Sequence, residues 1–140
     1  MILIVAVSEN GVIGRKGEIP WLVPADLQWF KLFTTSKTIA MGKNTFKSVG
    51  ILPGRTTIIL DRSTKLYELP KDTVIVGGGV IYKEAAQYCT HLLVSRIPQA
   101  IEDGDAFFEV PSNFTCTATI DFYSFKLEVY CREDILADDK

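Results

Sequence analysis

The first seven residues, from Met1 to Val7, are an unbroken run of apolar and mostly branched side chains. Such a run predicts a strand that is buried on both faces. Shorter apolar runs predict further strands at 38–41, 56–60, 74–76 and 92–97. Polar and apolar residues then alternate over 115–120 and 125–131, which predicts a closing antiparallel hairpin.

Helical segments are predicted between these strands. Pro24 suits the first position of a helix that ends near Thr34, because its fixed φ fits and its missing N–H needs no partner there. Shorter helices are predicted over 46–49 and 80–87. The alternation predicts an α/β fold: one domain over 1–133 with a mixed, mainly parallel central sheet flanked by helices and a C-terminal antiparallel hairpin. The acidic tail at 134–140 is expected to be frayed.

The helix after Pro24 places a carboxylate among aromatic residues. At 3.6 residues per turn, one side of this helix collects Asp26, Leu27, Trp29, Phe30 and Phe33. An ionised carboxylate there needs hydrogen-bond donors, or it takes up a proton. The alternative is that Asp26 simply complements the dipole of the first helical turn.

Composition narrows the function classes. The 140 residues are 47% hydrophobic and 23% charged, with a formal net charge of -2, which gives no electrostatic case for binding nucleic acid or an anionic membrane. Three separated cysteines and one histidine argue against a disulfide framework, a metal centre and a serine triad. His91 is expected near the start of a strand, without a chemical role. The composition fits a cytoplasmic protein.

Glycine-rich junctions are candidate phosphate sites. A long loop over 8–23 is punctuated by glycines, and a loop of that length is usually functional. Gly77, Gly78 and Gly79 lie between a strand and a helix, where backbone N–H groups can meet an anion. A dinucleotide fingerprint would need a glycine where Tyr82 stands, so these glycines can equally be a tight turn.

A set of motifs, taken together and in order, resembles the dihydrofolate reductase family from Met1 to about Tyr130. They are Val12-Ile13-Gly14, Pro20-Trp21, Pro24-Ala25-Asp26-Leu27, Trp29-Phe30-Lys31, Met41-Gly42-Lys43-Asn44-Thr45, Leu52-Pro53-Gly54-Arg55 and Val76-Gly77-Gly78-Gly79-Val80-Ile81-Tyr82. The resemblance implies a dihydrofolate-reductase-like fold and the NADPH-dependent reduction of 7,8-dihydrofolate to tetrahydrofolate. Hydride would pass from nicotinamide C4 to pterin C6, with protonation of N5.

The resemblance also implies substrate roles. Asp26 would accept from the pteridine N3 and 2-amino groups, supported by the Ser95 hydroxyl. A water beside Trp21 and Ile19 would protonate N5, and Arg55 would clamp the glutamate carboxylate. The remaining substrate contacts implied are Ile4, Val5, Leu27, Phe30, Lys31, Val49 and Leu52.

On the cofactor side the resemblance implies that Lys43 and Arg62, with Ser63, hold the 2′-phosphate of NADPH. Each cation can equally be a solvated loop residue. The other implied contacts are Ala6, Ile13, Gly14, Gly42, Asn44, Thr45, Leu60, Asp61, Val76, Gly77, Gly78, Gly79, Val80, Ile81 and Tyr82. Expected partners are dihydrofolate and antifolate inhibitors, with no metal, nucleic acid or membrane, and the chain is expected to be a monomer.

Three departures from the family stand out. The segment over 63–74 is short and leaves no room for the usual helix, and Asp61 lies beside the implied 2′-phosphate site. The turn at 122–124 is clipped, and Leu22 cannot offer the hydrogen bond of an Asn side chain. We expect the Asp105 carboxylate to hold the 8–23 loop closed by accepting hydrogen bonds from backbone N–H groups of the loop.

Two other functions remain open. One is a different reductase on this fold, of the pyrimidine reductase type of riboflavin synthesis. Asp26 and Arg55 speak against it, because that pair suits a pterin that carries a glutamate. The other is a non-catalytic module that kept the fold, which the short 63–74 segment alone supports.

Overall fold

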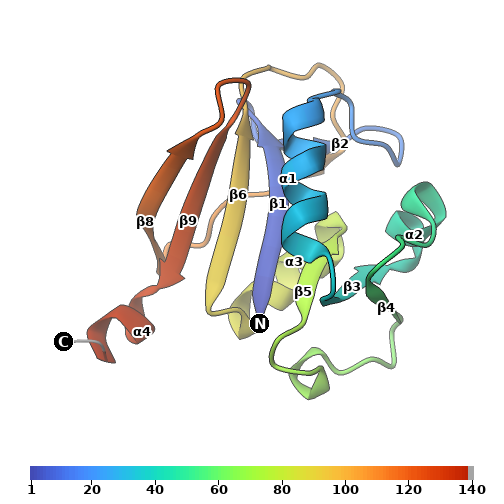
Figure 1. Cartoon of the computed structure of the whole chain (residues 1–140), viewed down its shortest axis with the longest axis vertical. Coiled ribbons are helices and arrows are strands. Elements are labelled where there is room, and N and C mark those ends of the chain that lie inside the picture. Colours follow the sequence, from blue (N-terminus) through green and yellow to red (C-terminus); the bar gives the residue numbers. More distant parts are fainter. Residues whose placement is uncertain (139–140) are drawn as a thin grey trace.

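Seven strands form one central sheet in a computed structural model of the chain, which describes residues 1–138 (Figure 1). The predicted α/β architecture is confirmed, with helices on both faces of the sheet. In chain order the elements are β1 (Ile2–Ser8), β2 (Val12–Gly14), α1 (Pro24–Thr34), β3 (Thr38–Gly42), α2 (Lys43–Val49), β4 (Thr56–Leu60), the 3-10 turn η1 (Leu66–Glu68), β5 (Val74–Gly77), α3 (Gly79–Ala85), the 3-10 turn η2 (Ala86–Tyr88), β6 (His91–Ile97), β7 (Ala106–Phe107), β8 (Phe114–Asp121), β9 (Lys126–Arg132) and α4 (Glu133–Asp138).

The strand order is β4-β3-β5-β1-β6-β9-β8. Neighbouring strands from β4 to β6 run parallel, whereas β9 pairs antiparallel with both β6 and β8. The sheet is therefore mainly parallel with an antiparallel hairpin at one edge, as the sequence predicts. The carboxyl ends of the five parallel strands share one edge, which is where ligands bind on such sheets.

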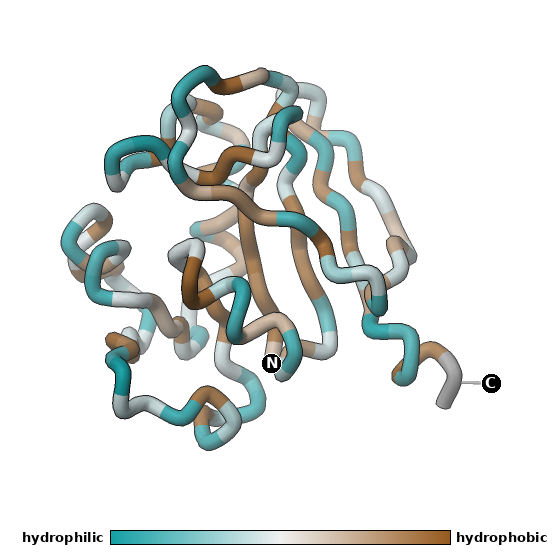
Figure 2. The backbone as a smooth tube through the Cα atoms, turned by 180° about the vertical axis from the view of Figure 1, so that it is seen from behind, coloured by the Kyte–Doolittle hydropathy of each residue, from teal (hydrophilic) through white to brown (hydrophobic). Residues whose placement is uncertain are grey.

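Residues of β1 contribute alternately to the two halves of the core. Leu3, Val5 and Val7 are buried in the cluster beneath α3, whereas Ile4 belongs to the cluster beneath α1. In Figure 2 the central strands carry mostly hydrophobic colour along their length, whereas polar colour is common in the surrounding loops. Burial on both faces explains why the sequence of β1 is a continuous apolar run.

Local boundaries differ from the sequence expectations in several places. Helix α2 begins three residues earlier than predicted, at Lys43, and α3 gives way to a 3-10 turn at Ala86. The expectation of a frayed tail is wrong for 134–138, which belong to α4, while 139–140 lie outside the described residues. In β8 every residue after Phe114 is exposed, because this strand lies at the edge of the sheet.

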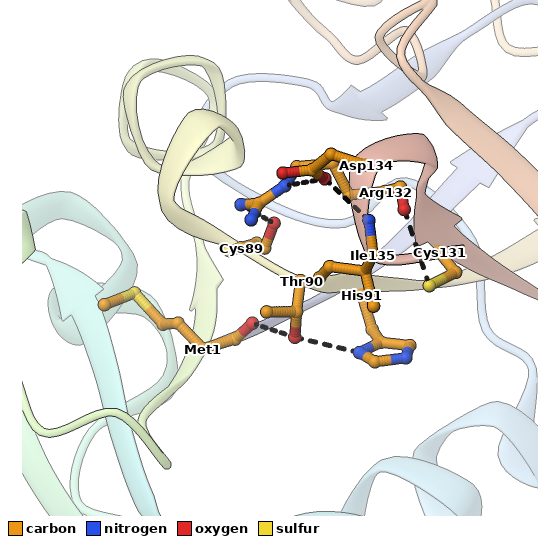
Figure 3. A network of polar contacts seen from close by, with 8 residues as sticks. All are labelled: Met1, Cys89, Thr90, His91, Cys131, Arg132, Asp134 and Ile135. Carbon is orange, nitrogen blue, oxygen red and sulfur yellow. Dashed lines mark hydrogen bonds and ion pairs between the residues drawn. The ribbon is translucent and has the colours of Figure 1, made fainter. Parts of the chain in front are cut away.

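Polar contacts fasten α4 to the amino end of the sheet (Figure 3). Arg132 pairs with Asp134, with Nε and Oδ1 2.6 Å apart, and its Nη1 donates to the Cys89 carbonyl at 3.2 Å. The carbonyl of Thr90 accepts from the Arg132 N–H, and its own N–H donates to the Met1 carbonyl. One residue, Thr90, thus connects the first and last strands. These bonds hold the start of α4. The acidic composition of this segment alone does not predict a helix there.

The short segment over 63–74 holds one 3-10 turn, η1, in place of a longer helix. Leu66 anchors this turn in the core beneath α3, with 8% of its surface exposed. The neighbouring Tyr67 is exposed and packs its ring against Tyr88, with centroids 6.2 Å apart. The absence of room for a helix in this segment is therefore confirmed for the described chain.

The 8–23 loop is held to the 104–108 segment by a two-stranded ladder that the sequence did not predict. Strand β2 pairs antiparallel with β7. The Asp105 N–H donates to the Gly14 carbonyl at 3.1 Å, and the Lys16 N–H donates to Asp105 Oδ2 at 2.9 Å. The expected role of Asp105 as an acceptor for the loop backbone is confirmed.

Lys16 and Gly17 both have positive φ, 52° and 78°, at the tip of a tight turn closed by Arg15 and Glu18. Two positive φ values at the central positions are typical of a type I′ hairpin turn. A lysine in this region costs on the order of 1 kcal/mol, so the bond to Asp105 stabilises a conformation that the residue disfavours. On the far side of the turn, the Ser48 hydroxyl of α2 donates to the Gly17 carbonyl at 2.7 Å.

Gly104→Ala tests the packing of this ladder. A Cβ at position 104 would lie 2.5 Å from both Val12 methyl carbons, and Val12 is buried. Overpacking of this kind typically costs about 1–3 kcal/mol, so we expect a lower free energy of unfolding in urea. Gly14→Ala is the matched control, because its Cβ would meet Ala106 at an ordinary 3.5 Å. Equal stability of the two variants would contradict the packing argument.

Candidate active site

Asp26 lies in the first turn of α1, above the point where β1 meets β6. Helix α1 begins at Pro24, as predicted, and the Asp26 N–H donates to the Val23 carbonyl at 3.0 Å. Ser95 of β6 pairs with Ala6 of β1 and is 1% exposed. The Ser95 side chain lies close enough to the Asp26 carboxyl to lower its pKa, so the structure brings these two predicted residues together.

Burial raises the pKa of the Asp26 carboxyl above its usual range, and the hydrogen bond from Ser95 offsets part of that rise. Desolvation acts in this direction because it disfavours the charged form of an acid. A carboxylate that only complemented the helix dipole would lie in water and would not be shifted in this way. The structure therefore favours a ligand-binding role for Asp26.

Tyr82 of α3 is hydrogen-bonded to β1 and lies near enough to Asp26 to be affected by its charge. Its buried hydroxyl donates to the Ile4 carbonyl of β1 at 2.7 Å. Burial raises the pKa of the Tyr82 phenol, and the nearby charge of Asp26 raises it further. At neutral pH the phenol is therefore a stable donor that fixes α3 against β1.

Residues predicted to surround the substrate occupy two kinds of position. Trp21, Phe30 and Leu52 pack against the core beneath α1, together with buried Ile4. Ile19, Leu27, Lys31 and Val49 are exposed on its rim. The side chain of Val5 packs in the cluster beneath α3, so a contact from this residue would come from its backbone. The residues packed on the core thus form an apolar floor, and the exposed residues surround it as an open rim.

Arg55 is oriented by the end of α1. Its Nε donates to the Thr34 hydroxyl at 3.1 Å, and its Nη1 donates to the Pro53 carbonyl at 3.0 Å. Thr34 is fully buried and donates in turn to the Phe30 carbonyl at 2.7 Å. A guanidinium has five N–H donors, so those left over can pair with a carboxylate. Thr34, which the sequence did not single out, is thus a positioning residue for Arg55.

Two glycine junctions pack against each other at the carboxyl edge of the sheet. A Cβ at Gly77 or at Gly78 would lie 3.0 Å from the Thr45 hydroxyl oxygen, and one at Gly42 would lie 3.3 Å from Ile81. Gly77 also has a φ of 150°, which favours glycine. These contacts explain why α2 and α3 can begin side by side with glycines at their caps.

A cavity of about 940 Å³ opens between these junctions and the polar turn after β4. It collects most of the predicted cofactor residues: Gly42, Lys43, Asn44, Thr45, Leu60, Asp61, Arg62, Ser63, Gly78, Gly79, Val80 and Ile81. Of the others, Ile13 lies against Gly79, and Gly14 lies in β2. Ala6 and Val76 pack in the core beneath α1. Most of the predicted cofactor residues therefore lie around one cavity at the carboxyl edge of the sheet.

Thr64 and Glu84 also line this cavity, although the sequence did not single them out. Thr64 belongs to the polar turn that follows β4, and Glu84 lies four residues beyond Val80 on α3. Helical spacing places Val80 and Glu84 on one face, which was the available signal for Glu84.

A second cavity of about 960 Å³ lies on the other side of α3, beside residues 107–112. Of the predicted site residues it touches Gly79 and Tyr82. Lys43, Arg62 and the first turn of α2 belong to the 940 Å³ cavity. The combination of cations and close backbone makes that cavity the better candidate for a nucleotide.

Within residues 1–138, no group of three or more His, Cys, Asp or Glu side chains is arranged to hold a metal ion. No helix in the same part of the chain is long and apolar enough to cross a bilayer.

Comparison with known proteins agrees with this geometry. The family model of dihydrofolate reductase matches residues 1–71. A dihydrofolate reductase of Haemophilus influenzae is 37% identical over 123 aligned positions, and the match covers 76% of this chain and 76% of that protein. The type 1 enzyme of Escherichia coli is 34% identical over 142 aligned positions, covering 87% of this chain and 90% of that protein.

A solved structure is similar over nearly the whole fold. It is the dihydrofolate reductase of Enterococcus faecalis in complex with NADP(H) and RAB-propyl, with a TM-score of 0.81 and 33% identity. The match covers 95% of this chain and 96% of that one. With the half-buried acid on α1, the glycine junctions and these relatives in agreement, the chain belongs to the dihydrofolate reductase family of oxidoreductases.

Proposed function

We propose that this chain catalyses the NADPH-dependent reduction of 7,8-dihydrofolate to 5,6,7,8-tetrahydrofolate at the site around Asp26. The observation that carries the proposal is a desolvated carboxyl on α1, beside buried Ser95, at the edge of the sheet where the glycine junctions lie. The named relatives support the same activity.

Asp26 recognises the pteridine in this proposal. Its two oxygens accept from the N3 and 2-amino groups, which present two donors on one edge of the ring. A charge-assisted pair of this geometry replaces the water that the carboxylate lost on burial. Phe30 and Leu52 supply an apolar wall, and Arg55 pairs with the glutamate carboxylate at the open rim.

Protonation of N5 is assigned to a water rather than to Asp26. Trp21 packs on the core beside this region, whereas Ile19 is 54% exposed at its rim. These two side chains shield the reacting face and leave a path for a single water. Asp26 polarises the ring from the opposite edge, so that N5 accepts the proton more readily.

The residues around the 940 Å³ cavity fit NADPH. Their backbone approaches closely because Gly77 and Gly78 leave no space for a Cβ beside Thr45. Lys43 and Arg62 line the same cavity and carry the positive charge that a 2′-phosphate requires. When bound, NADPH supplies the hydride, and the chain's own residues position the acceptor and exclude water.

The alternatives are disfavoured. A pyrimidine reductase has no need for Asp26 and Arg55 together, and the named relatives speak against a non-catalytic module. We further propose a cytoplasmic monomer whose substrate site also binds antifolates. The complex of a relative with RAB-propyl, a small molecule bound besides NADP(H), supports the last point. The formal net charge of -2 gives no reason to expect nucleic acid as a partner.

Asp26→Asn tests the catalytic assignment. The variant keeps the shape of the side chain and loses its charge, so we expect turnover at neutral pH to fall by on the order of 10²-fold or more. The loss shrinks at low pH, where part of the substrate is already protonated. Nicotinamide absorbance with NADPH and dihydrofolate measures it. Turnover within a few-fold of the parent would remove Asp26 from the mechanism.

The same substitution has the opposite effect on the stability of the ligand-free protein. Because the pKa of Asp26 is raised in the folded state, protonation stabilises the fold. This contribution is fully present below the unfolded value of 3.8 and is lost as the pH rises through the folded pKa. We therefore expect Asp26→Asn to raise Tm at pH 7 and to match the parent below pH 3.8.

Exposed Asp72 provides the matched control for this stability measurement. Asp72→Asn removes one charge from the surface and is expected to leave Tm unchanged at both pH values. A lower Tm for Asp26→Asn at pH 7 would contradict the desolvation of Asp26.

Asp105→Ala tests the loop. The substitution removes the acceptor of the Lys16 N–H, a bond worth about 1 kcal/mol at an exposed site, and should slow hydride transfer several-fold in single-turnover absorbance. Glu102→Ala is the control and should leave hydride transfer unchanged, since Glu102 contacts Arg15 through its backbone carbonyl and not through its side chain.

We also expect the closed form of the loop to be favoured. A crystal structure with the loop packed against the 122–124 turn would refute this expectation.

A further inference from the structure

The 940 Å³ cavity is lined by two side chains of each charge. Lys43 and Arg62 are cations, whereas Asp61 and Glu84 are carboxylates. Their formal charges cancel at neutral pH. A phosphate monoester carries about −1.5 to −2 at this pH, so each carboxylate opposes a bound 2′-phosphate by Coulomb repulsion while each cation attracts it.

Asp61 is the hub of the turn that follows β4. Its Oδ1 accepts from the Ser63 N–H at 2.9 Å, from the Ser63 hydroxyl at 2.6 Å and from the Thr64 hydroxyl at 3.1 Å. These hydrogen bonds lower the pKa of the Asp61 carboxyl, which is therefore ionised at neutral pH. The turn thus presents a fixed negative charge directly before Arg62.

Two consequences follow for a bound nucleotide. Both Ser63 donors that could bind a phosphate are already committed to Asp61. Among the hydrogen bonds of residues 1–138, none engages Asp61 Oδ2. That oxygen can accept from a hydroxyl but only repels a phosphate.

We propose that Asp61 reduces the preference of this site for a 2′-phosphorylated nucleotide over an unphosphorylated one, so that NADH competes with NADPH for binding. The inference rests on the proposed function, because it places the adenosine end of the cofactor in this cavity. Asp61 acts by repelling the 2′-phosphate and by accepting from the 2′-hydroxyl of the unphosphorylated ribose. Lys43 and Arg62 still attract the phosphate, which leaves a reduced preference rather than a reversed one.

Isothermal titration calorimetry of the full chain with 2′,5′-ADP and with 5′-AMP tests this directly. Asp61→Asn keeps an acceptor oxygen for Ser63 and Thr64 and removes the charge. We expect it to tighten 2′,5′-ADP roughly fivefold, the effect of one unit charge at about 6 Å in a largely aqueous medium, and to leave 5′-AMP unchanged or weaker. The gain should diminish at high salt.

Glu84→Gln provides a second variant that does not touch the 61–64 turn, and it should tighten 2′,5′-ADP in the same direction. Asp72→Asn, an exposed charge removed from outside the cavity, should change neither nucleotide. Unchanged binding of 2′,5′-ADP to both cavity variants would overturn the proposal. Tightening by Glu84→Gln alone would overturn the role of Asp61.

The parent protein separates this inference from the proposed function. If the parent binds 2′,5′-ADP and NADPH displaces it, the site assignment holds and the variants decide the role of Asp61. If NADPH binds but displaces neither nucleotide, the cavity assignment is wrong and the inference fails with it. If NADPH and dihydrofolate together give no loss of nicotinamide absorbance, the proposed activity itself fails.

Discussion

The desolvation of one carboxylate is the constraint on which this site depends. Asp26 lies over the carboxyl edge of the sheet because α1 begins there at Pro24 and because the aromatic residues of that helix pack against the core beneath it. A carboxylate in this position destabilises the empty fold at neutral pH, and Ser95 compensates in part. In the proposed function, a ligand that brings two donors would restore the balance, so the same group that weakens the free protein would also select the substrate.

Close backbone approach organises the nucleotide side in a comparable way. Gly42, Gly77 and Gly78 bring the starts of α2 and α3 together, and Thr45 fills the space that side chains would occupy. The turn after β4 completes the cavity, and its shape is set by Asp61 rather than by a helix in the shortened 63–74 segment. Asp61 therefore contributes both the shape of this turn and a negative charge, whereas the glycines shape the rest of the cavity without carrying charge.

Much of this could be predicted from local patterns. The apolar run of β1 and Pro24 located the central strand and α1 correctly, because burial on both faces and a fixed φ leave direct marks on sequence. Strands β2 and β7 escaped notice, since three and two residues are too short to show a period. The contacts of Ser63 with Asp61 and of Thr34 with Arg55 depend on side-chain direction, which a linear pattern does not record.

The shared contacts of Thr90 have a consequence for how the chain can be rearranged. Its N–H donates to the Met1 carbonyl and its carbonyl accepts from the Arg132 N–H, so one residue joins the first residue to the end of β9, remote from the carboxyl edge. Figure 3 shows the Thr90 hydroxyl in contact with the same Met1 carbonyl. Neither contact belongs to the substrate or nucleotide region. The fold is thus suited to circular permutation: a linker can lead from the residues after Arg132 back to Met1, and new ends can be opened in the exposed 70–72 connection without cutting a strand of the sheet.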